Sequence, residues 1–110
     1  GILGGIGTDP EDVMHMKRTA DRLFGDQFHW SVLGAGRHQM RIAAMAAGMG
    51  GNVRVGLEDS LWIKPKQLAT SNAEQVTQVR KLIEGMGLEI ATPDEARGML
   101  KLKGADRVGF

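Results

Sequence analysis

The chain has 110 residues, of which 42% are hydrophobic and 25% charged, so its composition is that of a globular chain with one core. The formal net charge is +1 at pH 7 with acids and bases mixed along the chain, which disfavours nucleic acid and acidic membranes as partners. The absence of cysteine excludes disulfides, thiolate nucleophiles and cysteine metal sites, and it favours a reducing compartment such as the cytoplasm.

The N-terminal part predicts a strand followed by a helix. Residues 1–7 are apolar and glycine-rich and contain neither a Met nor a basic segment, which does not suit a signal peptide. We predict that they form a strand that belongs to a longer polypeptide. Thr8 or Asp9 can cap a helix, Pro10 suits its first turn, and two acidic residues follow at the positive end of the helix dipole. Gly25 is a natural end for this helix.

A second strand and helix follow. Residues 28–33 are rich in strand-forming side chains and lead into a glycine turn. Residues 38–49 are rich in Met, Ala and Ile, which predicts a short, closely packed helix. The apolar run over residues 42–51 is too short to span a bilayer.

The third strand is predicted at residues 50–59, followed by a long loop over residues 60–70. Capping boxes at residues 71–74 and 92–95 predict two further helices, the first ending near Gly85 or Gly87 and the second near Lys101. Residues 104–110 are predicted to be a tail.

The three predicted strands start about 25 residues apart with helices between them, which is typical of the βα units of a parallel sheet. Three parallel strands would leave both edges and the apolar faces exposed. We therefore predict an α/β fold in which residues 1–110 form a partial domain: the last three βα units of a (β/α)8 TIM barrel, which typically needs about 250 residues.

The predicted strand over residues 50–59 has two unlike faces. One face is apolar and carries Val53, Val55 and Leu57, whereas the other carries Arg54, Gly56 and Glu58. At strand spacing, Arg54 and Glu58 would lie about 13 Å apart along the strand axis and need not pair. The charged face either meets solvent or lines the interior of a barrel, where ionisable groups indicate a functional site.

Other motifs are less specific. Residues 34–37, Gly-Ala-Gly-Arg, could present backbone N–H groups to a phosphate at the start of a helix, although a plain tight turn is the simpler reading. His15, His29 and His38 have no partner at metal-ligand spacing, so structural roles are favoured. The chain has no serine in a nucleophile elbow.

Three motifs in this order resemble the C-terminal part of the β-keto acid cleavage enzymes, whose named member is 3-keto-5-aminohexanoate cleavage enzyme. They are GGNVRVGLED at residues 50–59, LATSNAEQV at residues 68–76 and ATPDEAR at residues 91–97. The resemblance implies a zinc-dependent (β/α)8 barrel acyltransferase. Such an enzyme converts a β-keto acid and acetyl-CoA to acetoacetate and a new CoA thioester.

The resemblance also implies roles for individual residues. Glu58 is similar to the carboxylate ligand of the zinc ion, and Arg54 with Asp59 is similar to the pair implicated in activating the keto acid. The family's two histidine ligands lie in a His-x-His motif that this chain lacks, as do the catalytic residues of earlier strands. We therefore expect the chain to be inactive without an N-terminal barrel portion.

The loop after residue 59 departs from the family pattern at several positions. Ser60 and Trp62 stand where Asn and Tyr are more common, and Pro65 with Lys66 replaces a glycine-containing turn. Trp62, Lys64 and Lys66 could contact CoA or the acid's side chain, or could simply form a solvated loop.

Two other functions stay open at this point. One is a non-catalytic half-barrel that acts as an interaction module, for which a homo-oligomer could complete the sheet. The other is a different phosphate-binding TIM-barrel enzyme that uses residues 34–37. The identity of the β-keto acid is not determined by these motifs.

Overall fold

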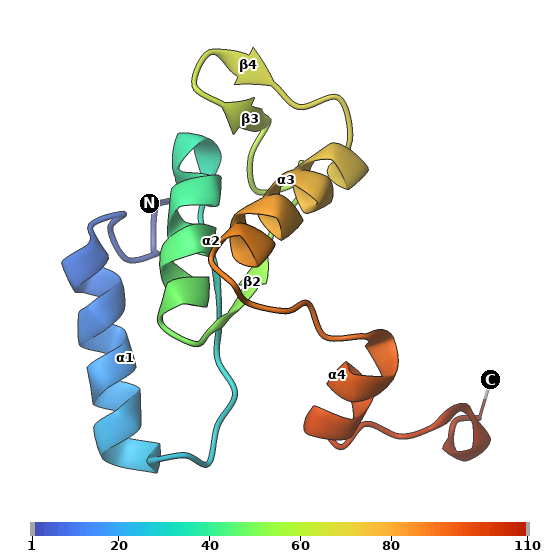
Figure 1. The fold of residues 1–110 in the computed structure, drawn as a ribbon. Helices are drawn as coiled ribbons and strands as arrows, with labels where there is room; N and C mark the ends of the chain where they lie inside the picture. Colours follow the sequence, from blue (N-terminus) through green and yellow to red (C-terminus); the bar gives the residue numbers. More distant parts are fainter. Residues whose placement is uncertain (1, 110) are drawn as a thin grey trace.

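The computed structural model describes residues 2–109 and shows four α-helices arranged around two small two-stranded sheets within that range (Figure 1). In chain order the elements are α1 (Pro10–Phe24), β1 (Ser31–Leu33), the 3-10 turn η1 (Gly36–His38), α2 (Gln39–Gly48), β2 (Asn52–Arg54), β3 (Trp62–Lys64), β4 (Gln67–Leu68), α3 (Asn72–Gly85), α4 (Pro93–Met99) and the 3-10 turn η2 (Ala105–Arg107).

The centre of the molecule is one βαβ unit. Strands β1 and β2 run parallel, with Val32 opposite Val53 and Leu33 opposite Arg54, and α2 forms the connection between them. Parallel neighbours need such a crossover because the end of the first strand and the start of the second lie at opposite ends of the strand pair. The α/β class with parallel strands and packed helices is confirmed.

The core lies between α2, α3 and β2. Its buried members are Ala43 and Ala47 from α2 with Val79 and Ile83 from α3. The small alanine side chains let the two helices approach closely. Val53 and Val55 pack against this cluster, as the alternating pattern predicts for the apolar face.

The predicted strand over residues 1–7 is wrong for residues 2–7, and Gly1 lies outside the described residues. Gly4 has a φ of +84°, which a strand cannot accommodate, and the Gly5 N–H donates to the Ile2 carbonyl at 2.9 Å. The backbone here bonds to itself in a turn, and no strand of residues 2–109 other than β2 pairs with β1.

The predicted strand over residues 28–33 is wrong for residues 28–30, since β1 begins at Ser31, and the predicted tail contains η2. Two further differences lie on either side of residue 60. The predicted strand over residues 50–59 ends at Arg54, because the N–H groups of Asp59 and Ser60 turn back to the Gly56 carbonyl, at 3.2 and 3.1 Å. The predicted loop over residues 60–70 contains an antiparallel hairpin, β3 with β4, whose turn holds Lys66 at a φ of +63°.

The helix boundaries follow the predicted caps. The side chains of Asp9, Ser71 and Thr92 accept hydrogen bonds from the first turns of α1, α3 and α4. In contrast to α2 and α3, helix α1 buries only Val13 and α4 buries no residue. No helix within residues 2–109 is both long and apolar enough to cross a membrane.

Candidate functional site

The predicted site residues meet at the carboxyl end of β2. Arg54 is the last residue of β2, and the turn that follows brings two carboxylates back to it. Its Nη2 lies 2.6 Å from Glu58 Oε2, and its Nε lies 3.0 Å from Asp59 Oδ2. The expected separation of about 13 Å between Arg54 and Glu58 is therefore wrong, because the strand stops before Glu58.

The two carboxylates differ in their surroundings. The side chain of Asp59 is 12% exposed, whereas that of Glu58 is 83% exposed and that of Arg54 is 52% exposed. Arg54 also donates from Nη2 to Asp59 Oδ1 at 3.3 Å, so the guanidinium contacts both oxygens of this carboxylate. Of these two contacts only the one to Oδ1 is a hydrogen bond, because Oδ2 is buried without a hydrogen-bond partner within the described residues and its contact with Nε is an ion pair. Asp59 is thus held in place, while Glu58 remains accessible to solvent.

The turn that carries these carboxylates is anchored by two side chains. Gln39 of α2 accepts the Gly56 N–H on Oε1 at 2.9 Å, and Asn72 of α3 accepts the Leu57 N–H on Oδ1 at 2.7 Å. Sequence reasoning did not identify either residue. The available signal for Gln39 was a long polar residue in a helix that is otherwise rich in Ala, Met and Ile.

A further buried polar side chain supports the chain after the turn. Gln75 of α3 donates from Nε2 to the carbonyls of Ser60 and Trp62, at 2.7 and 3.3 Å. Because Gln75 and Ser60 are both buried, the hydrogen bond to Ser60 lies out of reach of competing water, whereas the one to Trp62 is partly buried. They connect the hairpin to the core helix.

Residues 34–37 act as a packing turn. A Cβ on Gly34 would lie 2.9 Å from Ile42 Cβ and 3.0 Å from Gln39 Cα, so only glycine lets α2 approach this closely. The Gly36 N–H donates to the Asp59 carbonyl at 2.8 Å. One of the backbone donors that a phosphate would need is therefore already engaged, and the turn supports the carboxylate site instead.

The described residues do not form a metal site by themselves. Within residues 2–109, no group of three or more His, Asp, Glu or Cys side chains could hold a metal ion. The carboxylate of Glu58 is a chemically suitable oxygen ligand for a divalent cation. In this arrangement it is paired with Arg54, which a metal ion would have to displace.

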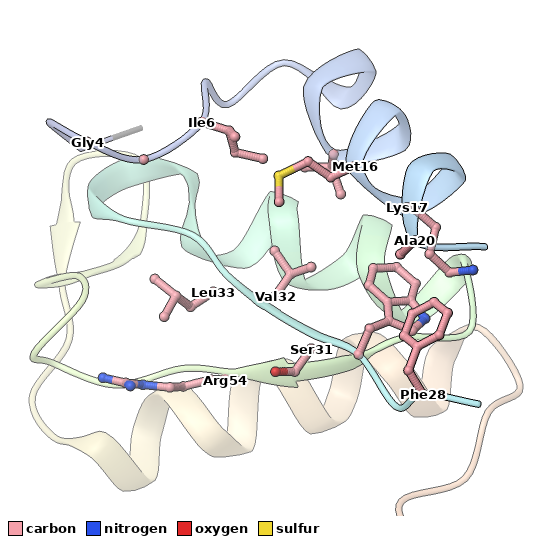
Figure 2. A pocket seen from close by; sticks show the side chains of 13 residues that line it. Gly4, Ile6, Met16, Lys17, Ala20, Phe28, Ser31, Val32, Leu33 and Arg54 are labelled. Carbon is pink, nitrogen blue, oxygen red and sulfur yellow. The ribbon is translucent and has the colours of Figure 1, made fainter. Parts of the chain in front are cut away.

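A cavity of about 600 Å³ separates α1 and the N-terminal segment from β1 (Figure 2). Its lining is mostly apolar, and Figure 2 shows Arg54 at one end and Phe28 at the other. The Lys17 ammonium lies 5.6 Å from the Phe28 ring centre and 5.3 Å from that of Trp30. Cation–π contacts of this kind place Lys17 at the aromatic end of the cavity.

Comparison with known proteins gives a consistent set of relatives. The sequence model of the beta-keto acid cleavage enzyme family matches residues 1–102. Over 110 residues the chain is 60% identical to the 3,5-dioxohexanoate:acetyl-CoA acetone transferase of Paraburkholderia graminis, matching all of this chain and 36% of that protein.

Two more relatives carry related names. A 3-keto-5-aminohexanoate cleavage enzyme of Fusobacterium nucleatum is 55% identical over 74 residues, which is 67% of this chain and 27% of that protein. A 3-oxoadipate:acetyl-CoA acetyltransferase of Cupriavidus necator is 37% identical over 102 residues, which is 93% of this chain and 36% of that protein. The chain thus spans about a third of the length of the relatives it matches.

Proposed function

The chain belongs to the beta-keto acid cleavage enzyme family, and on this premise we propose that it supplies the C-terminal part of a (β/α)8 barrel acyltransferase. The reaction converts a β-keto acid and acetyl-CoA to acetoacetate and a new CoA thioester. The bond between the keto carbon and the CH2 group breaks, and that CH2 group bonds to the acetyl carbon as the thioester C–S bond of acetyl-CoA breaks. The released CoA sulfur takes the remaining acyl group. The acetyl-CoA in the names of two relatives supports this choice of co-substrate.

The Arg54–Asp59 ion pair is the observation that carries the proposal. Its place at the carboxyl end of a parallel strand is where α/β barrels assemble active sites. Half of the Arg54 side chain is exposed and can bind the carboxylate or keto oxygen of a β-keto acid. Asp59, aimed by Arg54 and shielded from solvent, is suited to accept or share a proton as the carbon–carbon bond breaks.

Glu58 is proposed as one carboxylate ligand of a divalent metal ion, zinc, whose other ligands lie outside these 110 residues. Such an ion supplies Lewis-acid stabilisation for the negative charge that develops on the keto oxygen. The high exposure of Glu58 supports this role, because its carboxylate is free to move from Arg54 to a cation.

The wider proposal is that this chain is active only with the remainder of a barrel in a reducing, cytoplasmic compartment. The span of about a third of the relatives' length supports the need for further barrel units. The βαβ unit of β1, α2 and β2 would then form part of the larger parallel sheet. A homo-oligomer that completes the sheet is the alternative arrangement.

The test is a chimera in which these 110 residues replace the matching segment of the Paraburkholderia relative, with acetoacetate formation as the readout. We expect activity from the chimera. Asp59→Asn is expected to lower kcat by about 100-fold or more, as for a group that acts in proton transfer. Arg54→Lys is also expected to lower the rate, because lysine cannot reproduce the planar contact of the guanidinium with Asp59. Glu58→Gln is expected to reduce the bound metal content as well as the rate.

The opposite results decide between the candidate functions. No activity in a folded chimera, or full activity after Glu58→Gln, would contradict the proposed enzyme. Unchanged catalysis after Arg54→Ala would favour a different phosphate-binding enzyme. A well-folded monomer of the isolated chain in sedimentation would argue against both the barrel fragment and the half-barrel dimer.

A further inference from the structure

A groove of about 430 Å³ lies between the start of α2 and the β3–β4 hairpin. It is lined by Arg37, His38, Arg41, Trp62, Pro65 and Lys66. A second groove of about 260 Å³ shares Arg37, Arg41 and Trp62 with it and adds Lys64. Together they place four cationic side chains around one partly exposed indole, and no acidic residue lines either groove.

Among the residues that the structure describes, these four cations form no ion pair with a carboxylate. Within residues 2–109, the basic side chains of Lys17, Arg54, Arg80, Arg97 and Arg107 each form an ion pair. None of Arg37, Arg41, Lys64 and Lys66 does so among the described residues. Their charges are therefore available to an anion, and their clustering leaves this surface electropositive.

A buried donor and a strained turn point the same way. Gln39 is buried, lines the second groove, and makes no hydrogen bond from Nε2 within the described residues. Lys66 follows Pro65 in the hairpin turn at a φ of +63°, a conformation that glycine adopts without strain and lysine does not. A side chain kept at a strained position is a reason to seek a function for it.

We propose that the groove lined by Arg37, Arg41, Trp62 and Lys66 binds the adenosine-phosphate end of acetyl-CoA. This inference rests on the proposed function. Trp62 offers a flat surface for the purine ring. The guanidinium groups of Arg37 and Arg41 match the geometry of phosphate oxygens, and Lys66 adds a mobile point charge.

The groove is also placed for this purpose. Trp62 follows Asp59 by three residues, and Arg37 follows Gly36, whose N–H donates to the Asp59 carbonyl. A CoA molecule bound by its nucleotide in this groove could direct its thioester toward Arg54 and Asp59. The groove therefore adjoins the same turn that carries Asp59.

The test is a calorimetric titration of the chimera that carries these 110 residues with coenzyme A, dephospho-coenzyme A, ATP and pantetheine. We expect coenzyme A to bind more tightly than dephospho-coenzyme A and ATP, and pantetheine to bind least. Trp62→Ala should weaken coenzyme A binding about tenfold, the size expected for loss of one stacked base.

The decisive variants are Lys66→Gly and Lys101→Gly. Both remove a lysine held at positive φ, at +63° and +53°, and both relieve backbone strain, but Lys101 lies outside the two grooves. Lys66→Gly should remain folded by circular dichroism and weaken coenzyme A binding about threefold to fivefold, as for one exposed ion pair. Lys101→Gly should leave the affinity unchanged.

Equal affinity in the two glycine variants, or no binding of coenzyme A, would overturn this assignment. An active chimera with a KM for acetyl-CoA that is insensitive to Lys66→Gly would overturn it while leaving the proposed function intact. Coenzyme A binding that depends on Lys66, in a protein that forms no acetoacetate, would retain the groove and reject the proposed reaction.

Discussion

The packed region over residues 31–85 and the two flanking regions that contain α1 and α4 are built from the same kinds of helix but differ in what holds them. In the packed region, α2 and α3 bury apolar faces against each other and against β2. The flanking helices lie on opposite sides of this region in Figure 1 and bury only Val13 between them. Caps are thus sufficient to mark where a helix begins, whereas burial depends on a neighbour.

The difference explains where the candidate site lies. Arg54, Glu58 and Asp59 belong to the packed region, and their turn is fixed by Gln39 and Asn72 from its two helices. Both regions expose large apolar side chains; those of the flanking helices and the residues beside them include Met16, Leu23, Phe24, Met99, Leu100 and Leu102. Apolar surfaces of this kind commonly mark contacts with other parts of a protein, which agrees with the proposed larger barrel.

The largest contrast is expected from two isoleucines. Ile83 is 8% exposed in the core, whereas Ile90 is 41% exposed in the segment before α4. Ile83→Ala should lower the free energy of unfolding by about 2–5 kcal/mol because it leaves a cavity. Ile90→Ala should change it by less than about 0.5 kcal/mol. Urea denaturation measures both, and similar losses in the two variants would remove the distinction between the regions.

A second contrast uses two glycines. Gly34→Ala places a Cβ against Ile42 and the backbone of α2, so we expect a loss of about 1–3 kcal/mol from overpacking. Gly98 lies inside α4 with no atom within 4 Å of an added Cβ. Gly98→Ala should therefore increase helicity in circular dichroism without lowering the denaturation midpoint. Tolerance of alanine at Gly34 would contradict the close packing of this turn.

A smaller effect is expected from buried hydrogen bonding. Gln75→Met keeps much of the side-chain volume but removes the donor to the carbonyls of Ser60 and Trp62. We expect a loss of about 1 kcal/mol in unfolding free energy and faster amide exchange in the hairpin. Gln27→Met, at an exposed position after α1, should have no measurable effect. Equal exchange rates in the two variants would show that Gln75 does not hold the hairpin.

The smallest effect concerns pH. Hydrogen bonds from the backbone and hydroxyl groups of Thr70 and Thr92 lower the pKa of Glu74 and of Glu95, respectively, below the ordinary value of 4.5. Because each carboxylate is favoured in the folded state, its stabilisation is present above pH 4.5 and is lost as the pH falls through the lowered pKa.

The two glutamates should report on different regions. Glu74→Gln should reduce the acid dependence of the denaturation midpoint, since Glu74 lies in the first turn of the core helix α3. Glu95→Gln should change only the helicity of α4. A shift of the global midpoint by Glu95→Gln would show that α4 contributes to the cooperative unit.

Much of the local structure could be predicted because its causes are local. The caps at Asp9, Ser71 and Thr92 and the alternation of Val53 and Val55 each depend on neighbouring residues. The hairpin after residue 60 could not be predicted in the same way. Its turn places a lysine where glycine is usual, and β3 is held by Gln75 from a distant helix.

The sequence by itself determined which residues belong to the candidate site, because Arg54, Glu58 and Asp59 stand out by their chemistry and by their place in a recognisable motif. Only the tertiary structure decided how they are arranged. The turn at Gly56 replaces strand spacing by direct ion pairs, and it forms because Gln39 and Asn72, on two separate helices, satisfy the backbone N–H groups that a continuing strand would have used. Such contacts between distant residues depend on packing and leave no local pattern in the chain.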